Sequence, residues 1–470
     1  MAIKTKIKAF NHQGKGIGNY NGKVYFIPDT IPEEEISFEI IDEKKNYGLG
    51  KVTEFLTKSK DRITPNCPYY QKCGGCHLSH MKYEKQLEFK KATLIDILRK
   101  YSDIEIEPKL IAPRSNFNYR NKITLKIMNN KWGYYKEESH NFVQIDSCLI
   151  AKDSINKIIK NNSLFNIKNG EITIRTNQDN EILININTKD KINLDLDKLS
   201  GLNIIGVILN NNLLYGQKSL TQKVGEYSFQ VDYNSFFQIN LEILSEVLKI
   251  LNQKKYRNAL DLYCGVGTLG TALNKQKLIG IESSNSSIKN AKINNKLNKQ
   301  KNTYVLGDSS KLKEIDEDID VVVVDPPRSG MNKPTLRHLL EQKPKEIIYM
   351  SCNPVTLASD LKELKKYFNI KEVYLLDMFP ETYHIETLIF LELKKEKLID
   401  LHMHTTYSDG TDSLPELLKK CEEKNLALIS ITDHDGVEAY FELYLKKLKN
   451  IFLDKLLLVQ NIKPFIMIKH

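Results

Sequence analysis

The sequence contains no uninterrupted apolar run of about 18 residues, the length that a membrane-spanning helix requires. Its first ten residues are basic, and the apolar stretch of a secretory signal peptide does not follow them. These two absences argue against a membrane protein and against a secreted one. We therefore expect a cytoplasmic protein without a membrane partner, and no feature of the sequence indicates an obligate protein partner.

A regular set of paired cysteines is also missing. The chain has seven cysteines, an odd number, and Cys67, Cys73 and Cys76 fall within ten residues. Disulfide frameworks of secreted domains have an even number of cysteines at regular spacing. In a reducing compartment, thiols clustered in this way more often bind a metal or take part in catalysis.

The three clustered cysteines have the spacing C-x5-C-x2-C, and Cys148 is the natural fourth ligand. Four thiolates suit a zinc ion or an iron–sulfur cluster. Zinc sites more often combine two C-x2-C pairs, and this sequence has one. The C-x3-C-x2-C motif of radical S-adenosylmethionine enzymes is absent. The spacing therefore predicts a metal site and leaves its type open.

The chain of 470 residues is long enough for about two to four domains, and 41% hydrophobic with 27% charged residues is a globular composition. Lysine and arginine number 69 against 59 acidic residues, which gives a formal net charge of +10. This excess suits a polyanionic partner such as RNA. A proteome rich in lysine and asparagine explains the same excess equally well, so the charge alone does not decide.

Changes in the hydrophobic pattern predict a multidomain α/β protein with four regions. Residues 1–57 favour short strands of a small β-barrel of the oligonucleotide-binding type, with a purely structural barrel as the alternative. Residues 58–225 hold the cysteine cluster, a polar helix and a β-rich region that we expect to be antiparallel. Residues 226–395 alternate strands and helices, which is typical of a parallel sheet flanked by helices. The fourth region is a C-terminal tail, residues 396–470, which begins with a different motif.

The segment 261–270, DLYCGVGTLG, follows a predicted strand and opens a helix. Gly265 and Gly267 let the backbone approach a ligand at the carboxyl end of that strand. Glu282 ends the next strand, where a carboxylate can accept from both ribose hydroxyls, and Asp308 is placed to meet an adenine amino group. Together these residues predict an adenosine-containing cofactor. An NAD-binding fold is the alternative, but the loop lacks the G-x-G-x-x-G spacing.

Two further motifs follow strands of the same region. Asp325 in DPPRSG ends the fourth strand, and Pro326 and Pro327 stiffen the loop that presents its carboxylate to a flat substrate. Cys352 in SCNP lies between a strand and a helix, and a helix N-terminus lowers a thiol pKa and favours the thiolate. A plain turn and a buried cysteine are the alternative interpretations.

Glu386 lies just before the last predicted strand, so we expect it on the same rim of the sheet as Cys352. A nucleophile and a carboxylate on one rim suit a covalent, two-step reaction. We predict that the thiolate of Cys352 adds to C6 of a uridine, that C5 takes a methyl group, and that Glu386 removes the C5 proton. An amino-directed methyltransferase that uses DPPR would not need Cys352.

The segment YNSFFQIN supplies further candidates for the substrate base. Gln238 and Asp325 would hold the edge of the uracil and the cofactor. A base must leave its stack to reach a buried thiol, and Phe236 and Phe237 offer flat surfaces for it. Simple core packing is the alternative for at least one of the two rings.

Seven motifs occur in the order found in the RNA uracil-C5 methyltransferases, which this chain resembles: CPYYQKCGGC, YRNK, NSFFQIN, DLYCGVGTLG, DPPRSG, SCNP and HIET. The resemblance covers about residues 1–395. It implies an N-terminal TRAM barrel of the OB type, a central RNA-binding domain with a [4Fe-4S] cluster, and a class I, Rossmann-like methyltransferase domain that uses S-adenosyl-L-methionine. Cluster-bearing enzymes of the 23S rRNA type are the most similar, but other cluster-bearing members act on tRNA, so both targets stay open.

The resemblance also implies roles for individual residues. It implies Cys352 as the nucleophile and Glu386 as the base. It assigns contacts with the cofactor or the base to Gln238, Tyr263, Thr268, Glu282, Asp308 and Asp325. It assigns the ligands of the cluster to Cys67, Cys73, Cys76 and Cys148.

The tail contains LHMHTTYSDGT and ITDHDG, which resemble the opening of a PHP metal-dependent phosphoesterase domain. His402, His404, Asp409 and His434 have metal-ligand chemistry. Only about 75 residues remain, and several later ligands of such a domain are missing, so we expect a truncated fragment without phosphoesterase activity. The alternative of another class is a working metal phosphoesterase whose front half binds RNA.

Overall fold

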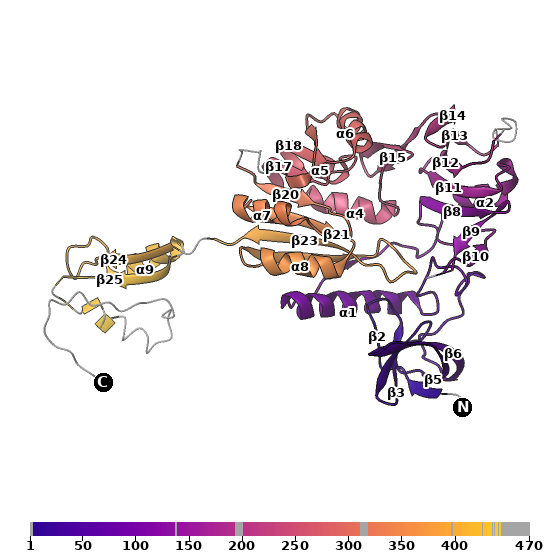
Figure 1. Ribbon diagram of the computed structural model, residues 1–470. Helices are drawn as coiled ribbons and strands as arrows, with labels where there is room; N and C mark the ends of the chain where they lie inside the picture. Colours follow the sequence, from indigo (N-terminus) through magenta and orange to yellow (C-terminus); the bar gives the residue numbers. More distant parts are fainter. Residues whose placement is uncertain are drawn as a thin grey trace. The chain divides into compact units, whose positions relative to one another are not determined.

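The computed structural model is a mixed α/β structure with several sheets, and it separates into two compact units, Met1–Leu393 and Lys394–His470 (Figure 1). The structure describes residues 3–136, 139–192, 201–310, 318–395, 398–424, 426–434, 436, 438–439 and 441–442. Within these ranges, no helix is both long enough and apolar enough to cross a membrane.

The first unit begins with a six-stranded sheet. Its strands are β1 (Ile3–Lys6), β2 (Ala9–Phe10), β3 (Gly16–Tyr20), β4 (Lys23–Ile27), β5 (Glu35–Glu43) and β6 (Tyr47–Thr57). They are ordered β1-β5-β6-β4-β3-β2, around a small core that includes Ile27 and Phe38. Gly50 lets β6 pass close to that core, because a Cβ there would lie 2.6 Å from Phe38. The predicted strands are present, and closure into a barrel stays a prediction.

A seven-stranded sheet forms the centre of the β-rich region. Its order is β10 (Phe142–Gln144), β9 (Lys131–Tyr135), β8 (Lys122–Met128), β11 (Asn169–Thr176), β12 (Ile182–Thr188), β13 (Ile204–Leu209) and β14 (Asn212–Gly216). Helix α2 (Asp153–Lys160) and a 3-10 turn, η1 (Asn162–Leu164), accompany it, and β15 (Ser219–Val224) pairs separately with β16 (Tyr227–Asp232). The expectation of an antiparallel region was wrong for one pair, since β12 and β13 are parallel. The connection between them is long enough for the crossover that parallel pairing requires.

The largest sheet has eight strands. Their order is β19 (Thr303–Leu306), β18 (Asn274–Glu282), β17 (Lys255–Leu262), β20 (Val321–Val324), β21 (Glu346–Ser351), β23 (Glu386–Leu393), β22 (Phe368–Leu376) and β7 (Lys109–Ile111). The first five are parallel, whereas β23 runs antiparallel to both of its neighbours. The parallel sheet predicted for this region is therefore present, with one reversed strand inserted near its end.

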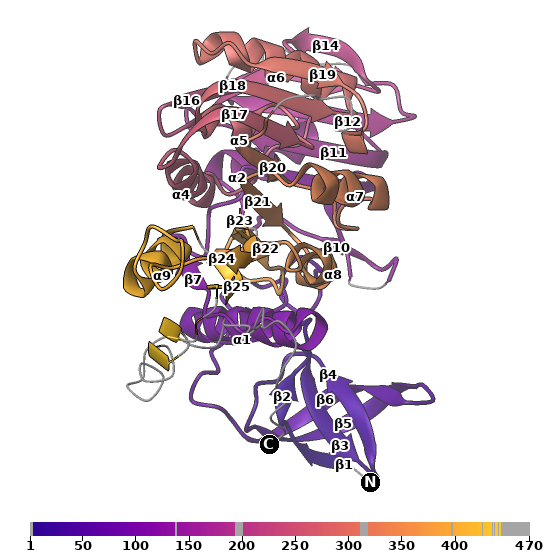
Figure 2. The same ribbon diagram turned by 90° about the vertical axis from the view of Figure 1, so that its left-hand side faces the viewer.

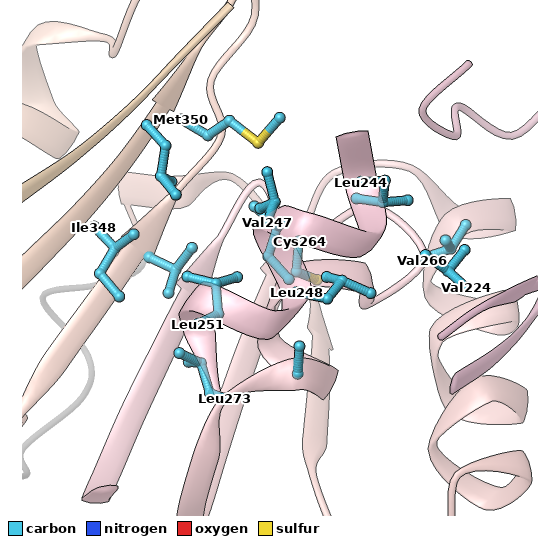
Figure 3. Close-up of a cluster of buried hydrophobic side chains, with 14 of the residues drawn as sticks. Val224, Leu244, Val247, Leu248, Leu251, Cys264, Val266, Leu273, Ile348 and Met350 are labelled. Carbon is cyan, nitrogen blue, oxygen red and sulfur yellow. The ribbon is translucent and has the colours of Figure 1, made fainter. Parts of the chain in front are cut away.

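Helices cover both faces of this sheet. Core residues of α4 (Leu241–Leu251), α5 (Thr268–Ala272) and α6 (Asn285–Leu297) pack on one face, as Figure 3 shows for α4. Those of α1 (Tyr83–Ser102), α7 (Lys333–Gln342) and α8 (Pro354–Leu364) pack on the other. The run VVVV of β20 serves both, because Val321 and Val323 belong to one core cluster while Val322 and Val324 belong to the other. An apolar run without alternation is what a strand buried on both faces requires.

Two segments from before residue 226 join this sheet. Helix α1 packs against α8, and both views place it between the eight-stranded and the six-stranded sheet (Figures 1 and 2). Strand β7 pairs in parallel with β22, which would otherwise be an edge strand. We expected the segment of β7 in the antiparallel region, and this expectation was wrong. The boundaries predicted at residues 57 and 225 stay predictions.

The second unit contains a parallel pair of strands, β24 (Leu398–Met403) and β25 (Leu426–Ile431), with α9 (Leu414–Glu423) between them in sequence. Helix α9 begins with a capping box formed by Ser413 and Glu416. The apolar final stretch noted in the sequence lies outside the described residues.

Candidate active site and cysteine cavity

Three predicted active-site residues lie at one end of the eight-stranded sheet. Asp325 directly follows β20, Cys352 directly follows β21, and Glu386 is the first residue of β23. Strands β21 and β23 are antiparallel neighbours, and their ladder ends with the pair Ser351 and Thr387. Cys352 and Glu386 are therefore the next two residues in register. Since β20 and β21 are parallel neighbours, Asp325 lies at the same rim.

A cavity of about 170 Å³ opens beside Cys352, and Arg328 and His384 contribute to its wall. The backbone carbonyl of Arg328 accepts hydrogen bonds from Asn353 Nδ2 (2.9 Å) and Thr356 Oγ1 (3.1 Å). These bonds fix the DPPR loop to the start of α8. Sequence reasoning assigned no role to Arg328 or His384, although both belong to motifs that it quoted.

The thiol of Cys352 is less acidic than the sequence predicted. Its pKa is raised to about 11, mainly by burial and then by the charges of Glu386 and Asp325, while Arg328 opposes the shift. The expectation that the helix N-terminus would lower this pKa was therefore wrong. The physical reason is that desolvation and two nearby carboxylates outweigh the helix end and one arginine.

The pKa values of the two carboxyl groups beside this thiol, Asp325 and Glu386, are raised as well. Burial raises the pKa of Asp325 to about 7. Burial is also the main cause that raises the pKa of Glu386, followed by the charge of Asp325, while Arg328 opposes both. Glu386 is only 2% exposed. A buried carboxyl group of raised pKa suits proton transfer near neutral pH.

The glycine loop after β17 holds an unusual backbone. Tyr263 has φ +60°, a conformation that costs free energy for a residue with a side chain. A Cβ on Gly265 would meet nothing within 4 Å, so this glycine borders open space. Among the described residues, Asp261 Oδ1 and the Tyr263 hydroxyl are buried without a hydrogen-bond partner. A glycine that borders open space, together with buried polar atoms that have no partner, fits a polar ligand such as the predicted cofactor.

The remaining cofactor candidates follow the neighbouring strands. Glu282 Oε2 accepts from the backbone N–H of Gly265 (3.0 Å), so the end of β18 is tied to the glycine loop. Asp308 follows β19 and is exposed, and its pKa is lowered by the backbone N–H of Ser310. Thr268 is the first residue of α5. The structure thus brings these candidates to the rim that carries Asp325.

The two aromatic rings of the segment before α4, Phe236 and Phe237, lie in different environments. Phe237 is buried in the hydrophobic core, which confirms core packing for this ring. Phe236 is 66% exposed and is free to present its face to a base. Gln238 is buried beside them, and its backbone carbonyl accepts from Asn121 Nδ2 (3.3 Å).

The four predicted metal-ligand thiols line one small cavity. They are Cys67, Cys73, Cys76 and Cys148. The first three lie in one loop, and the loop of Cys148 is held by Asn156, whose side chain both accepts from and donates to the Cys148 backbone. Arg120 lines the same cavity, and its Nε is buried without a hydrogen-bond partner among the described residues. A cavity that combines four thiols with a cation fits an anionic metal–thiolate centre.

Comparison with known proteins gives the family. The model of the family tRNA (Uracil-5-)-methyltransferase matches residues 82–394, more than half of the chain. The chain belongs to this family. An uncharacterized RNA methyltransferase of Clostridium acetobutylicum is 34% identical over 441 residues, covering 82% of this chain and 96% of the relative. One of Aquifex aeolicus is 33% identical over 424 residues, covering 83% and 99%.

The fold of this uracil-5-methyltransferase family member also has a solved counterpart. The crystal structure of Pyrococcus abyssi tRNA (uracil-54, C5)-methyltransferase in complex with S-adenosyl-L-homocysteine matches with a TM-score of 0.69. The match covers 83% of this chain and all of that chain at 24% identity, which shows the shared fold. The predicted family and the predicted enzyme class, an RNA uracil-C5 methyltransferase, are therefore confirmed.

The second unit gathers part of its predicted metal site. Ligand atoms of His404, Asp409 and His434 all lie within 4.8 Å of one another. His402 joins them through a contact of 3.0 Å between its Nε2 and that of His404. Sequence reasoning missed Asp433, which accepts hydrogen bonds from the backbone and side chain of the residue after His404. The PHP domain model matches residues 400–466, which confirms the resemblance of the tail.

Proposed function

We propose that this chain uses S-adenosyl-L-methionine to methylate C5 of a uridine in RNA, with Cys352 as the nucleophile and Glu386 as the base. The observation that carries the proposal is the pairing of β21 with β23, which sets these two residues in register at one rim. The glycine loop with its unpartnered polar atoms opens near the same rim. A thiol, a buried carboxyl group and a cofactor loop are the parts that a covalent methylation of a pyrimidine requires.

The chemistry divides between the two side chains. Uridine C5 is a poor nucleophile until the sulfur of Cys352 bonds to C6, which places negative charge on the ring. S-adenosyl-L-methionine supplies an electrophilic methyl group when bound. The carboxylate of Glu386 then takes the proton from C5, the C5–C6 double bond forms again, and the sulfur leaves as a thiolate. Arg328 stabilises that thiolate, because its charge lowers the pKa of Cys352.

The other site residues would hold the reactants. Asp325, Gln238 and the exposed ring of Phe236 would position the uracil. The cofactor would be bound by the glycine loop and the strand ends beside it, through Tyr263, Thr268, Glu282 and Asp308. The order of these strand ends around β17 supports one continuous binding site.

The RNA target is proposed to be 23S rRNA, with tRNA as the second candidate. The cysteine motif favours rRNA, whereas the name of the matching family and that of the P. abyssi enzyme favour tRNA. The purified protein, incubated with S-adenosyl-L-methionine and unmodified 23S rRNA or tRNA, should form 5-methyluridine in one of them. Digestion and mass spectrometry of nucleosides measure it. The absence of 5-methyluridine from both RNAs would refute the proposed function.

The cysteine cavity is proposed to hold a [4Fe-4S] cluster. The four thiols line one cavity together with Arg120, whose positive charge offsets the negative charge of a cluster bound by four thiolates. Iron and sulfide analysis of anaerobically purified protein tests it, and stoichiometric zinc without iron would contradict it.

RNA binding is proposed along a groove of about 720 Å³ between the six-stranded sheet and the cysteine loop. Basic and aromatic side chains line it, including Lys51, Lys72, Lys136, Phe26 and Phe55. Cations that contact phosphate combined with rings that stack on bases are typical of single-strand binding. This groove supports the interpretation of residues 1–57 as a TRAM domain that binds RNA, and the whole chain is proposed to be a cytoplasmic RNA-modifying enzyme.

A further inference from the structure

The loop between β22 and β23 leads directly into Glu386, and buried groups hold its first half. Asp377 is fully buried and accepts from Lys90 Nζ (2.6 Å) and from the Tyr83 hydroxyl (2.6 Å). Lys90 also donates to the carbonyl of Phe379 (2.9 Å). A buried, fully paired lysine and aspartate hold a backbone firmly, since separating them leaves an uncompensated charge.

Glu381 is the residue of this loop with the most connections. It is 2% exposed and has φ +67°, a strained conformation for a residue with a side chain. Its backbone N–H donates to Gln86 Oε1 (3.1 Å). Its side-chain Oε1 accepts from Gln86 Nε2 (3.1 Å) and Asn116 Nδ2 (2.6 Å). A strained conformation persists only where several contacts enforce it, and such residues cluster at functional sites. Glu381 is therefore a candidate for a functional role in this loop.

The backbone carbonyl of Glu381 joins this loop to the cysteine loop. It accepts from the N–H groups of His77 (2.9 Å) and Leu78 (3.0 Å), the two residues that follow Cys76. The ring of His77 also packs on that of Tyr383, with centroids 4.6 Å apart. A path of contacts therefore leads from the predicted metal ligand Cys76, through two backbone hydrogen bonds, to the loop that precedes Glu386.

A second route reaches the loop of Cys148. The N–H groups of Asn118 and Arg120 donate to the carbonyls of Leu149 (2.9 Å) and Ile150 (2.8 Å), just after that cysteine. Asn116, which donates to Glu381, lies two residues before Asn118 in the same segment. Both loops that supply thiols to the cavity are thus connected with Glu381.

We infer that Glu381 is a positioning residue that transmits the state of the cysteine cavity to Glu386. With metal bound, the two cysteine loops are fixed, and their bonds hold the loop of Glu381 so that Glu386 faces the substrate ring. Without metal, the segments that bond to Glu381 become more mobile, and the carboxylate of Glu386 is no longer held in its position. The inference rests on the proposed function for the role of Glu386, but the coupling itself does not depend on catalysis.

The side chain of Glu381 offers a matched pair of variants. Both side-chain bonds end on Oε1, so Glu381→Gln can keep them, whereas Glu381→Ala loses them and retains the same backbone. Glu84 on the exposed side of α1 serves as a control, through Glu84→Ala. Comparison of the glutamine and alanine variants separates the hydrogen bonds from the mere presence of a substitution.

The experiment measures hydrogen exchange of the peptide 377–386 in the full chain, with the metal centre loaded, removed by chelation and reconstituted. Removal should raise exchange there by about tenfold or more, and reconstitution should restore protection. Glu381→Ala should show raised exchange while it retains its iron, and removal of the metal should add less to it than to the unchanged chain, because the variant keeps only the backbone hydrogen bonds of Glu381. Glu381→Gln and the control should match the unchanged chain.

Turnover supplies a second measurement that does not require metal removal. In loaded protein, Glu381→Ala should lower kcat by about tenfold to 100-fold with KM nearly unchanged, because a base displaced by about 1 Å loses reactivity rather than substrate binding. Unchanged exchange on metal removal, additive effects, or equal behaviour of the alanine and glutamine variants would each overturn the inference. A chain that forms no 5-methyluridine would refute the proposed function, and the exchange data would still decide the coupling.

Discussion

The two units of this chain each gather side chains suited to a chemical site, but they support them very differently. In Met1–Leu393, Cys352 and Glu386 lie at the end of an eight-stranded sheet that has helices on both faces. In the described part of Lys394–His470, the three metal-type side chains lie in loops beside the strand pair of β24 and β25 and helix α9. Over the described residues, the first site has a large scaffold and the second has a small one.

Burial shows what this difference means for chemistry. Glu386 is 2% exposed, whereas the side chains of Asp409 and His434 are 69% and 63% exposed. Water screens charges that are exposed, and charges in a buried site act strongly on one another. Suitable residues are therefore not enough for a site, because a scaffold must also exclude water and hold geometry. Four predictions test this contrast.

The largest effect is expected at the sulfur of the buried site. Cys352→Ala should lower methylation by more than about 10⁴-fold, because the covalent route is lost entirely. Tritium release from RNA that contains 5-³H-uridine measures it. Cys421→Ala, a buried thiol of the second unit, should release tritium at the normal rate. Normal release by the Cys352 variant would refute the covalent scheme.

The carboxylate beside this sulfur should be the next most sensitive group. Glu386→Gln should lower turnover by about 10²-fold to 10⁴-fold, the range typical of a missing general base. The RNA should remain bonded to Cys352 after methyl transfer, as a band of protein and RNA on a denaturing gel. Glu392→Gln, near the other end of the same strand, serves as the control. Full turnover without an adduct would assign the base elsewhere.

A moderate effect is expected on the reactivity of Cys352 itself. At pH 9, Asp325 carries its charge, since its pKa is about 7, and this charge raises the pKa of Cys352. Asp325→Asn should therefore speed alkylation of Cys352 by iodoacetamide, and Arg328→Gln should slow it, each by about twofold to tenfold. The gain in Asp325→Asn should fade as the pH falls through 7. Peptide mass spectrometry measures the rates, and equal rates in all three proteins would contradict this electrostatic account.

The smallest effect is expected from the second unit. A chain ending at residue 395 should methylate RNA within about twofold of the full chain, because a compact unit can fold and act by itself. Full-length His404→Ala should behave in the same way. Methylation that falls tenfold or more in the shortened chain would show that the contrast between the two units is wrong. Metal-dependent phosphatase activity that disappears with the tail would favour the alternative of a working phosphoesterase.

The positions of Asp325 and Cys352 at one rim of the sheet could be predicted from the local sequence pattern. The run VVVV before Asp325 and the run EIIYM before Cys352 predicted strands, and strands β20 and β21 end there. The segment 356–368, TLASDLKELKKYF, predicted a helix after Cys352, and α8 begins at Pro354. Because parallel strands end at one edge, these local predictions were enough to gather Asp325 and Cys352.

Other features had no local signal. Strand β7 sits beside β22, more than 250 residues later in the chain, and only packing selects that partner. The pKa of Cys352 depends on Glu386 and Asp325, which burial brings near the thiol, and the local rule of a helix end gave the wrong direction.

The amino-acid sequence by itself determined the types of side chain at each strand end, the cysteine spacing and the family motifs, because these depend on residues close together in the chain. Only the tertiary structure decided that β23 lies between β21 and β22 and so sets Glu386 beside Cys352. It also decided that Glu381 joins the cysteine loop to the loop of the base. The physical reason is that strand order and hydrogen bonds between residues hundreds of positions apart depend on the packing of the whole core.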